Sequence, residues 1–206
     1  MESHNYLGIY LRSDRATVVC VAGQGRDRKL LGGFSVSVEG QPENVQQALA
    51  ERIAKGCSDR NLKFGQAAVA LDCTLFMQHA VHSEFSDHKR IAATVRFDTE
   101  EALAMDVADV AVAFRIVSSD DSGSNLDVFT AQRGVLSDVL LALQGAGIDP
   151  VTVDPDSYCL SRYLDAYGTS GESSEPRSLY AMLSDSRGYL LTAPTSAGAF
   201  TMPVLV

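Results

Sequence analysis

The first 72 residues hold a fixed order of short apolar segments, and this order constrains the fold more than any other feature of the chain. Three segments separated by short polar turns predict an antiparallel meander; they are residues 6–12, 16–22 and 29–38. Residues 41–56 then carry apolar side chains at four-residue intervals and predict a helix that Gly56 is placed to end. The apolar run 66–72 is typical of a strand buried on both faces.

The rest of the chain continues to alternate strands and helices. The predicted strands are residues 75–85, 110–117, 125–132, 148–154, 178–184, 188–194 and 197–206. The predicted helices are residues 86–105, with Ser86 as N-cap, residues 134–147, and a segment capped by Asp154 and opened by Pro155. The polar loop 118–124 is expected to be mobile. This pattern predicts an α/β fold with a twisted core sheet, helices on it, and an inserted α/β module.

Charge and composition exclude several classes of function. The 206 residues include 46% hydrophobic and 21% charged residues, as in ordinary globular domains, and the net charge is −9. An acidic chain without a basic cluster is a poor ligand for nucleic acid or for an anionic membrane surface. No apolar stretch approaches the roughly 20 residues that span a bilayer, and the first residues lack the features of a signal peptide. We therefore expect a cytoplasmic protein without direct membrane insertion.

The cysteines and histidines do not predict a metal site. The four cysteines are scattered and form no CxxC pair; Cys20 and Cys159 lie in apolar patterns and are expected to be buried thiols rather than ligands or disulfides. His79 and His82 lie in a predicted strand, where residues three apart point to opposite faces. We therefore expect no bound metal at these histidines or at nearby His88.

The sequence also predicts no catalytic residues. The acidic run 119–121 lies in a polar loop, and no Ser/His/Asp or Cys/His order points to a nucleophile. Asp154 ends a predicted strand, which is where ligand sites lie in α/β sheets. The other interpretation of Asp154 is a helix N-cap, and we favour that role.

Two longer segments carry a resemblance to a known family. "KRIAATVRFDTEEALAMDVADVAVAFRIV" and "VFTAQRGVLSDVLLALQGAGIDPVTVDPDSYCLSRYL" resemble, in order, successive segments of PilM-like type IV pilus assembly proteins. "LGIYLRSDRATVVCV" stands where that family has its first phosphate loop. The cytoplasmic domain of type II secretion L proteins shares the same fold. The resemblance implies an actin-like fold, with a ribonuclease-H-like core over residues 1–72 and 148–206 and an inserted subdomain over 73–147.

The resemblance also implies where a nucleotide would bind, and the sequence departs from the family there. The implied nucleotide-loop positions are Tyr10, Arg12, Ser13, Asp154 and Asp185. Nucleotide-binding members resemble LGIDLG at the first loop, where the acid helps to hold Mg²⁺ and the glycine lets backbone amides approach phosphate. This chain has LGIYLR, and its second loop offers Leu183-Ser184-Asp185, or Asp185 followed by Arg187, instead of DIGA. The family's proline at the bend is replaced by Ala104.

The implied function is therefore a non-catalytic, cytoplasmic scaffold of a type IV pilus or type II secretion-like assembly, without a cofactor. Its implied partner is a membrane-anchored assembly protein, whose cytoplasmic peptide would lie in a groove flanked by residues 75–81 and 89–95. Apolar residues there would otherwise only fill the module's own core. An assembly ATPase and a second copy of the chain, paired through residues 197–206, are further candidate partners. The alternative function is a fragment of an actin-like ATPase that binds ATP and Mg²⁺ once its second half is present.

Overall fold

The computed structural model of the protein describes residues 5–23, 28–40, 44–103, 106–167, 179–183 and 188–192. The chain forms two compact units. Unit 1 comprises residues 1–72 and 134–156, and unit 2 comprises residues 73–133 and 157–206. These units differ from the expected core and insert in the placement of residues 134–147 and 157–206. The difference arises because residues 134–145, which are helical, belong to unit 1. The helical residues 157–167 belong to unit 2.

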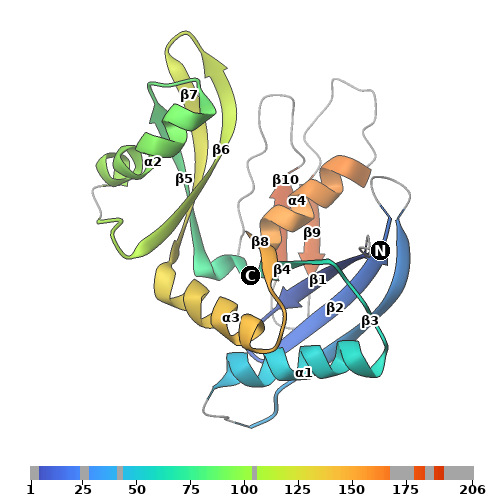
Figure 1. Cartoon of the computed structure of the whole chain (residues 1–206). Helices are drawn as coiled ribbons and strands as arrows, with labels where there is room; N and C mark the ends of the chain where they lie inside the picture. Colours follow the sequence, from blue (N-terminus) through green and yellow to red (C-terminus); the bar gives the residue numbers. More distant parts are fainter. Residues whose placement is uncertain are drawn as a thin grey trace. The chain divides into compact units, whose positions relative to one another are not determined.

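Unit 1 is built on a five-stranded sheet in the order β3-β2-β1-β4-β8 (Figure 1). Its strands are β1 (Asn5–Leu11), β2 (Arg15–Ala22), β3 (Lys29–Ser37), β4 (Gln66–Leu71) and β8 (Pro150–Pro155). The first three form the predicted antiparallel meander, whereas β1 pairs with β4, and β4 with β8, in parallel. The sheet is therefore mixed, and three of its strands end at the same edge.

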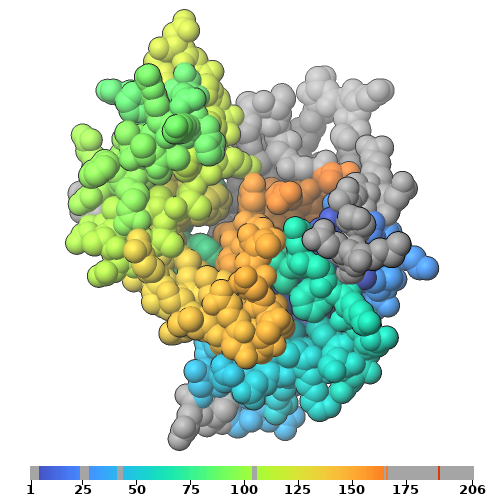
Figure 2. All heavy atoms as spheres, viewed as in Figure 1, coloured from blue at the N-terminus to red at the C-terminus, as the bar shows by residue number. Residues whose placement is uncertain are grey.

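The core of unit 1 lies on one face of this sheet, under two helices. Alternate residues of β1, β2 and β4 are buried there: Leu7, Ile9, Leu11, Ala16, Val18, Cys20, Ala67, Val69 and Leu71. The helices α1 (Val45–Asp59) and α3 (Arg133–Gly145) bury Leu49, Ile53 and Leu143. In the space-filling view the atoms of α1 adjoin those of α3 (Figure 2). The period-two and period-four patterns of the sequence thus meet in one apolar layer.

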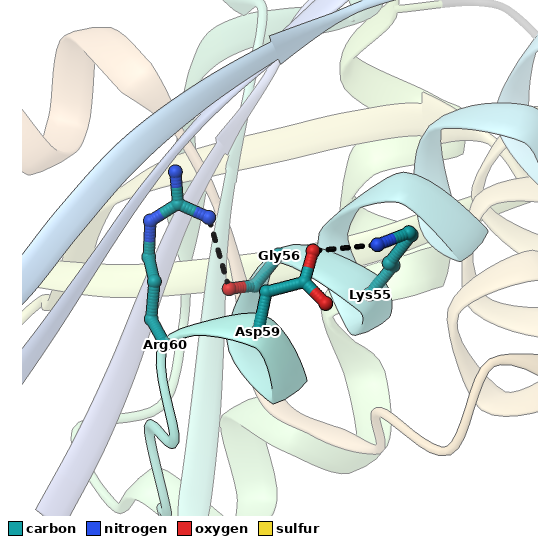
Figure 3. A network of polar contacts seen from close by, with 4 residues as sticks. All are labelled: Lys55, Gly56, Asp59 and Arg60. Carbon is teal, nitrogen blue, oxygen red and sulfur yellow. Dashed lines mark hydrogen bonds and ion pairs between the residues drawn. The ribbon is translucent and has the colours of Figure 1, made fainter.

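The end of α1 differs from its prediction. Gly56 does not end the helix, which runs on to Asp59 and is followed by Asn61 in the left-handed region at φ 50°. A Cβ on Gly56 would lie 2.3 Å from the Phe34 ring, so the glycine allows the helix to approach β3 closely. Arg60 donates to the carbonyl of Gly56 at 3.2 Å and lies over the same ring, while Lys55 pairs with Asp59 (Figure 3).

Unit 2 contains a three-stranded antiparallel sheet in the order β5-β7-β6. Its strands are β5 (Phe76–Ser83), β6 (Val110–Asp120) and β7 (Gly123–Gln132). The prediction of a mobile loop over residues 118–124 is wrong, because β6 and β7 extend into this segment and form a tight hairpin. Its polar side chains bond to one another, including Ser119 with Ser124 at 2.7 Å. Gly123 has φ 129°, and a Cβ there would lie 2.1 Å from the carbonyl oxygen of Ser83.

One face of this sheet is covered by α2 (His88–Leu103). The helix begins after Asp87, which caps the amide of Arg90 at 3.0 Å, so the predicted N-cap Ser86 is wrong by one residue. The core between sheet and helix consists of Val81, Ile91, Val95, Leu126 and Val128. The bend position Ala104 lies outside the described residues.

The remaining elements of unit 2 are a short 3-10 turn, one helix and a hairpin. They are η1 (Cys73–Leu75), α4 (Asp156–Tyr167), β9 (Leu179–Leu183) and β10 (Gly188–Thr192). Buried Cys73 packs against Leu160 and Leu164 of α4. The two strands, which pair as an antiparallel hairpin, confirm two of the three strands predicted in this part of the chain, and the expected strand 197–206 lies outside the described residues. No described helix has the length and apolar character needed to cross a bilayer.

A buried ion pair joins two strands of unit 2 beneath an aromatic contact to α4. Arg115 of β6 pairs with Asp127 of β7, which is 4% exposed. The Arg115 guanidinium also lies 5.6 Å from the ring of Tyr158, which packs on Phe129 at 5.8 Å. On the sheet face that carries Arg115 and Phe129, an ion pair and aromatic contacts therefore provide packing that aliphatic side chains provide in unit 1.

Candidate functional site

The parallel strands of unit 1 bring three chain segments together at their carboxyl ends. The register aligns Leu11 of β1 with Leu71 of β4, and Leu71 with Pro155 of β8. Arg12, Asp72 and Asp156 follow these residues directly. Ligands of open α/β sheets bind at this edge, so it is the candidate site that the fold itself defines.

Tyr10 is tied to the start of α4 at this edge. Its hydroxyl donates a hydrogen bond to Oδ2 of Asp156 at 2.9 Å. Asp156 is 5% exposed and is the acidic residue in the first turn of α4, where the helix dipole stabilises a negative charge. The half-buried ring thus holds a buried carboxylate at the position where the resemblance implies a magnesium ligand.

Asp154 lies on the same row of the sheet as Tyr10. The register aligns Tyr10 with Ala70 and Ala70 with Asp154, so one strand separates the two side chains, a spacing of about 10 Å. The favoured N-cap role of Asp154 is wrong, because β8 includes Asp154 and Pro155 and the helix begins at Asp156. Asp154 is instead a half-buried strand residue at the candidate site.

Arg12 and Ser13 form the turn between β1 and β2. The amide of Arg12 donates to the carbonyl of Arg15 at 2.8 Å, and the amide of Val38 donates to the carbonyl of Asp14 at 2.8 Å. The turn is thus closed by its own backbone and held by the end of β3. Ser13 is exposed at its tip. The fifth implied position, Asp185, lies outside the described residues.

These residues do not fit a magnesium-bound nucleotide in the way that the resemblance implies. Mg²⁺ requires hard oxygen ligands in near-octahedral geometry, whereas position 10 carries a phenol whose hydroxyl donates a hydrogen bond to Asp156. Phosphate requires backbone amides that face it, whereas the amide of Arg12 closes the hairpin. Among the described residues, no group of three or more His, Cys, Asp or Glu side chains could hold a metal ion.

Two buried acids at this edge were missed by sequence reasoning. Asp72 is 7% exposed and ends the apolar run of β4, and Asp156 follows the Asp-Pro pair at the end of β8. An acid directly after a buried strand is the signal that could have identified both. The structure therefore assembles a different set from the predicted one: Tyr10, Asp72, Asp154 and Asp156.

The histidines His79 and His82 have different polar neighbours. His79 approaches Thr130 at 3.4 Å, and its partial burial lowers its pKa. His82 contacts Asn125 and the carbonyl of Ser122, each at 3.3 Å. Burial confirms Cys20 as an interior thiol and raises its pKa, whereas Cys159 is only half-buried.

The segments expected to flank a peptide groove contribute to the core of unit 2. Val81, Ile91 and Val95 belong to one apolar cluster, as the alternative interpretation predicts. Leu75 and Met77 remain exposed at 39% and 46%. The apolar character of these two segments therefore has a structural cause, and only its exposed part is left for a partner.

Comparison with known proteins identifies the fold. No family model and no curated protein matches the sequence. Among solved structures, the chain is similar to a chain of the PilM-PilN type IV pilus biogenesis complex, with 19% identity and a TM-score of 0.75 over 97% of this chain. It is also similar to a Bacteroides thetaiotaomicron protein of unknown function with an actin-like ATPase fold, with 11% identity and a TM-score of 0.54 over this whole chain and 72% of that one. This is the actin-like fold.

A third similar structure is the cytoplasmic domain of EpsL, an inner membrane component of the type II secretion system of Vibrio cholerae. The identity is 16% and the TM-score 0.60, over 97% of this chain and 71% of that domain. The chain spans 61% of the chain that it matches in the PilM-PilN complex. At these identities the comparisons establish the actin-like fold, and the activities and partners of those proteins are not thereby transferred.

Proposed function

We propose that this chain is a non-catalytic, cytoplasmic scaffold in a type IV pilus or type II secretion-like assembly, and that it docks a cytoplasmic peptide of a membrane-anchored partner. The observation that carries the proposal is the likeness to the PilM-PilN complex, which extends over 97% of the chain. The likeness to the cytoplasmic domain of an inner membrane component supports a place beside the membrane.

The non-catalytic part of the proposal rests on the carboxyl edge of unit 1. The hydrogen bond from Tyr10 to Asp156 and the closed turn at Arg12 occupy the groups that a magnesium-bound nucleotide would need. We expect isothermal titration calorimetry with MgATP to detect no binding to the wild-type chain. Tight binding would contradict this part of the proposal. The variant Tyr10→Phe should be slightly less stable, since a buried carboxylate loses a donor worth about 1 kcal/mol, and it should leave nucleotide affinity unchanged.

The docking part is tested with a partner from the same cell. Cross-linking of the tagged chain in its host, followed by extraction of the membrane fraction, should capture a membrane-anchored protein with a short cytoplasmic segment. A synthetic peptide of that segment should then bind the purified chain in fluorescence anisotropy, and a scrambled peptide should not. Equal binding of both peptides, or capture from the soluble fraction alone, would overturn the docking role.

The second candidate function, a fragment of an actin-like ATPase, is kept because the chain spans 61% of the chain that it matches in the PilM-PilN complex. In that case any longer product of the same gene would bind MgATP, whether or not the 206-residue chain binds it alone. Calorimetry on both lengths separates the two functions. Nucleotide binding by the longer product alone would favour the ATPase.

A further inference from the structure

Two arginines of unit 2 converge on one backbone carbonyl. Arg96 of α2 donates through Nη1 to the carbonyl oxygen of Val110 at 3.3 Å, and it donates through Nη2 to the carbonyl of Val107. Arg133 donates through Nη2 to the same oxygen of Val110, also at 3.3 Å. The two guanidinium groups are therefore neighbours at the end of the three-stranded sheet.

The positions of both arginines are fixed by the backbone around them. Val107 and Val110 are each 3% exposed, so the two carbonyls belong to a buried frame. The amide of Arg133 donates to the carbonyl of Asp109 at 3.0 Å, which attaches the start of α3 to the same loop. The two bonds of the Arg96 side chain restrict its freedom before a ligand binds, which favours binding, whereas the exposed Arg133 side chain is held by one bond.

Among the described residues, no acid forms an ion pair with Arg96 or Arg133. The ion pairs recorded there join Arg15 to Asp14, Lys55 to Asp59 and Arg115 to Asp127. Glu100 lies one helical turn after Arg96 and forms no ion pair with it, and the Asp106 carboxylate instead accepts from the amide of Ala108 at 2.7 Å. Two adjacent cations without an acid are unexpected in a chain with 26 acidic and 17 basic residues.

We propose that Arg96 and Arg133 form a binding site for one carboxylate of a partner protein, supplied by an acidic side chain or by a chain end. Each guanidinium presents five N–H donors, of which Arg96 uses its two terminal nitrogens and Arg133 uses one. The planar fork of an arginine matches the two oxygens of a carboxylate, and an anion between two guanidiniums relieves their mutual repulsion.

The site lies entirely within unit 2 and uses none of the residues at the carboxyl edge of unit 1. It therefore stands independently of the assembly to which the chain belongs. If the docking role is correct, the site gives the partner a chemical character, because the docked segment would carry an acid. If the docking role fails, the site still predicts a carboxylate ligand, and the two outcomes remain distinguishable.

Nuclear magnetic resonance of the arginine side chains tests the site directly on the full chain. The probes are N-acetyl-aspartate α-amide for a side-chain carboxylate, N-acetyl-alanine for a chain end, and inorganic phosphate, all at constant ionic strength. We expect the Nε–Hε signals of Arg96 and Arg133 to shift together and to saturate with one of the two carboxylates. The better of the two identifies the source. Absence of saturation, or tighter binding of phosphate, would overturn the proposal.

Variants separate binding from folding. Arg133→Gln should weaken binding of the carboxylate probe at least tenfold. Arg133→Lys should also weaken its binding, because lysine keeps the charge but lacks the planar pair of donors of a guanidinium. Arg52→Gln is the matched control, since Arg52 also donates to a backbone carbonyl, that of Ser37 at 2.6 Å, but belongs to unit 1 and is not part of the proposed site. The Arg52 variant should leave the affinity unchanged, and an equal loss would contradict the site.

The acid could also come from a second copy of this acidic chain. Light scattering and a dilution series without added probe test this directly. Arginine signals that move on dilution together with dissociation of a dimer would assign the carboxylate to the second copy and would refute a separate partner. Signals that are independent of protein concentration, with saturation by added carboxylate, support the separate partner.

Discussion

Units 1 and 2 bury different kinds of side chain. The face of the unit 1 sheet under α1 and α3 is an apolar layer of leucine, isoleucine and valine, and its described buried acids, Asp72 and Asp156, lie at the carboxyl edge. Unit 2 has a smaller apolar cluster, and it buries Thr99, Ser124, Asp127 and Thr130, whose side chains all form hydrogen bonds or close polar contacts. The first unit is therefore stabilised mainly by close packing and buried apolar area, whereas the second depends more on hydrogen bonds and ion pairs between buried polar groups.

The largest expected effect is the loss of Gly123 in the hairpin of unit 2. Gly123→Ala places a Cβ 2.1 Å from a backbone oxygen at φ 129°, so strain and overpacking combine to about 4 kcal/mol of lost unfolding free energy. Urea unfolding measures this loss. Gly40→Ala is the control, because Gly40 also has a positive φ of 83° but nothing within 4 Å, and should cost about 1 kcal/mol. Equal losses would show that contact with β5 is unimportant.

The next effect tests the buried charge of unit 2. Asp127→Asn leaves Arg115 without its carboxylate, and we expect a loss of about 2 kcal/mol, reduced because the Arg115 side chain is 32% exposed. Asp14→Asn removes an ion pair in which both side chains are about half exposed, and should cost less than about 0.5 kcal/mol. Thermal unfolding of the two variants provides the comparison. If Asp127→Asn is as mild as Asp14→Asn, unit 2 does not depend on this pair.

A smaller effect tests the close approach in unit 1. Gly56→Ala improves helix propensity but places a Cβ 2.3 Å from the Phe34 ring, and the net loss should be about 1 kcal/mol. Gly134→Ala in α3, with nothing within 4 Å, should instead stabilise the protein by about 0.5 kcal/mol. Adding Phe34→Leu to Gly56→Ala should recover part of the loss in a double-mutant cycle. Additive effects would contradict a steric cause.

The smallest effect concerns acid sensitivity in unit 2. Burial lowers the pKa of His79 from its ordinary value of 6.5, so the folded state favours neutral imidazole. That contribution to stability is present above pH 6.5 and is lost as the pH falls below it, because the unfolded chain then binds the proton more readily. His79→Gln should therefore reduce the fall in unfolding temperature between pH 7.5 and pH 5 by a few degrees at most. An unchanged fall in the His79→Gln variant would refute the assignment to His79.

Much of unit 1 could be predicted from its sequence, because its strands alternate with period two and its first helix repeats apolar residues every four positions. The role of Gly56 could not, since it depends on a phenylalanine 22 positions earlier. In unit 2 the polar run 118–124 has the composition of a loop, yet its side chains pair across a hairpin. At the candidate site, Tyr10 was identified through the family resemblance, whereas Asp156 was not identified. Their contact joins residues 146 positions apart, which no local pattern records.

The strand order of unit 1 has a consequence during synthesis. Strand β4 pairs with β1, but its other neighbour β8 begins roughly 80 residues later along the chain. At ordinary translation speeds this interval lasts about 4 to 16 s, ample time for the three-stranded sheet of unit 2 to fold. For that period the growing chain presents β4 as an open edge with apolar residues, which is a template for wrong pairing. A chaperone that acts on this nascent chain would therefore be needed most before Pro150 leaves the ribosome.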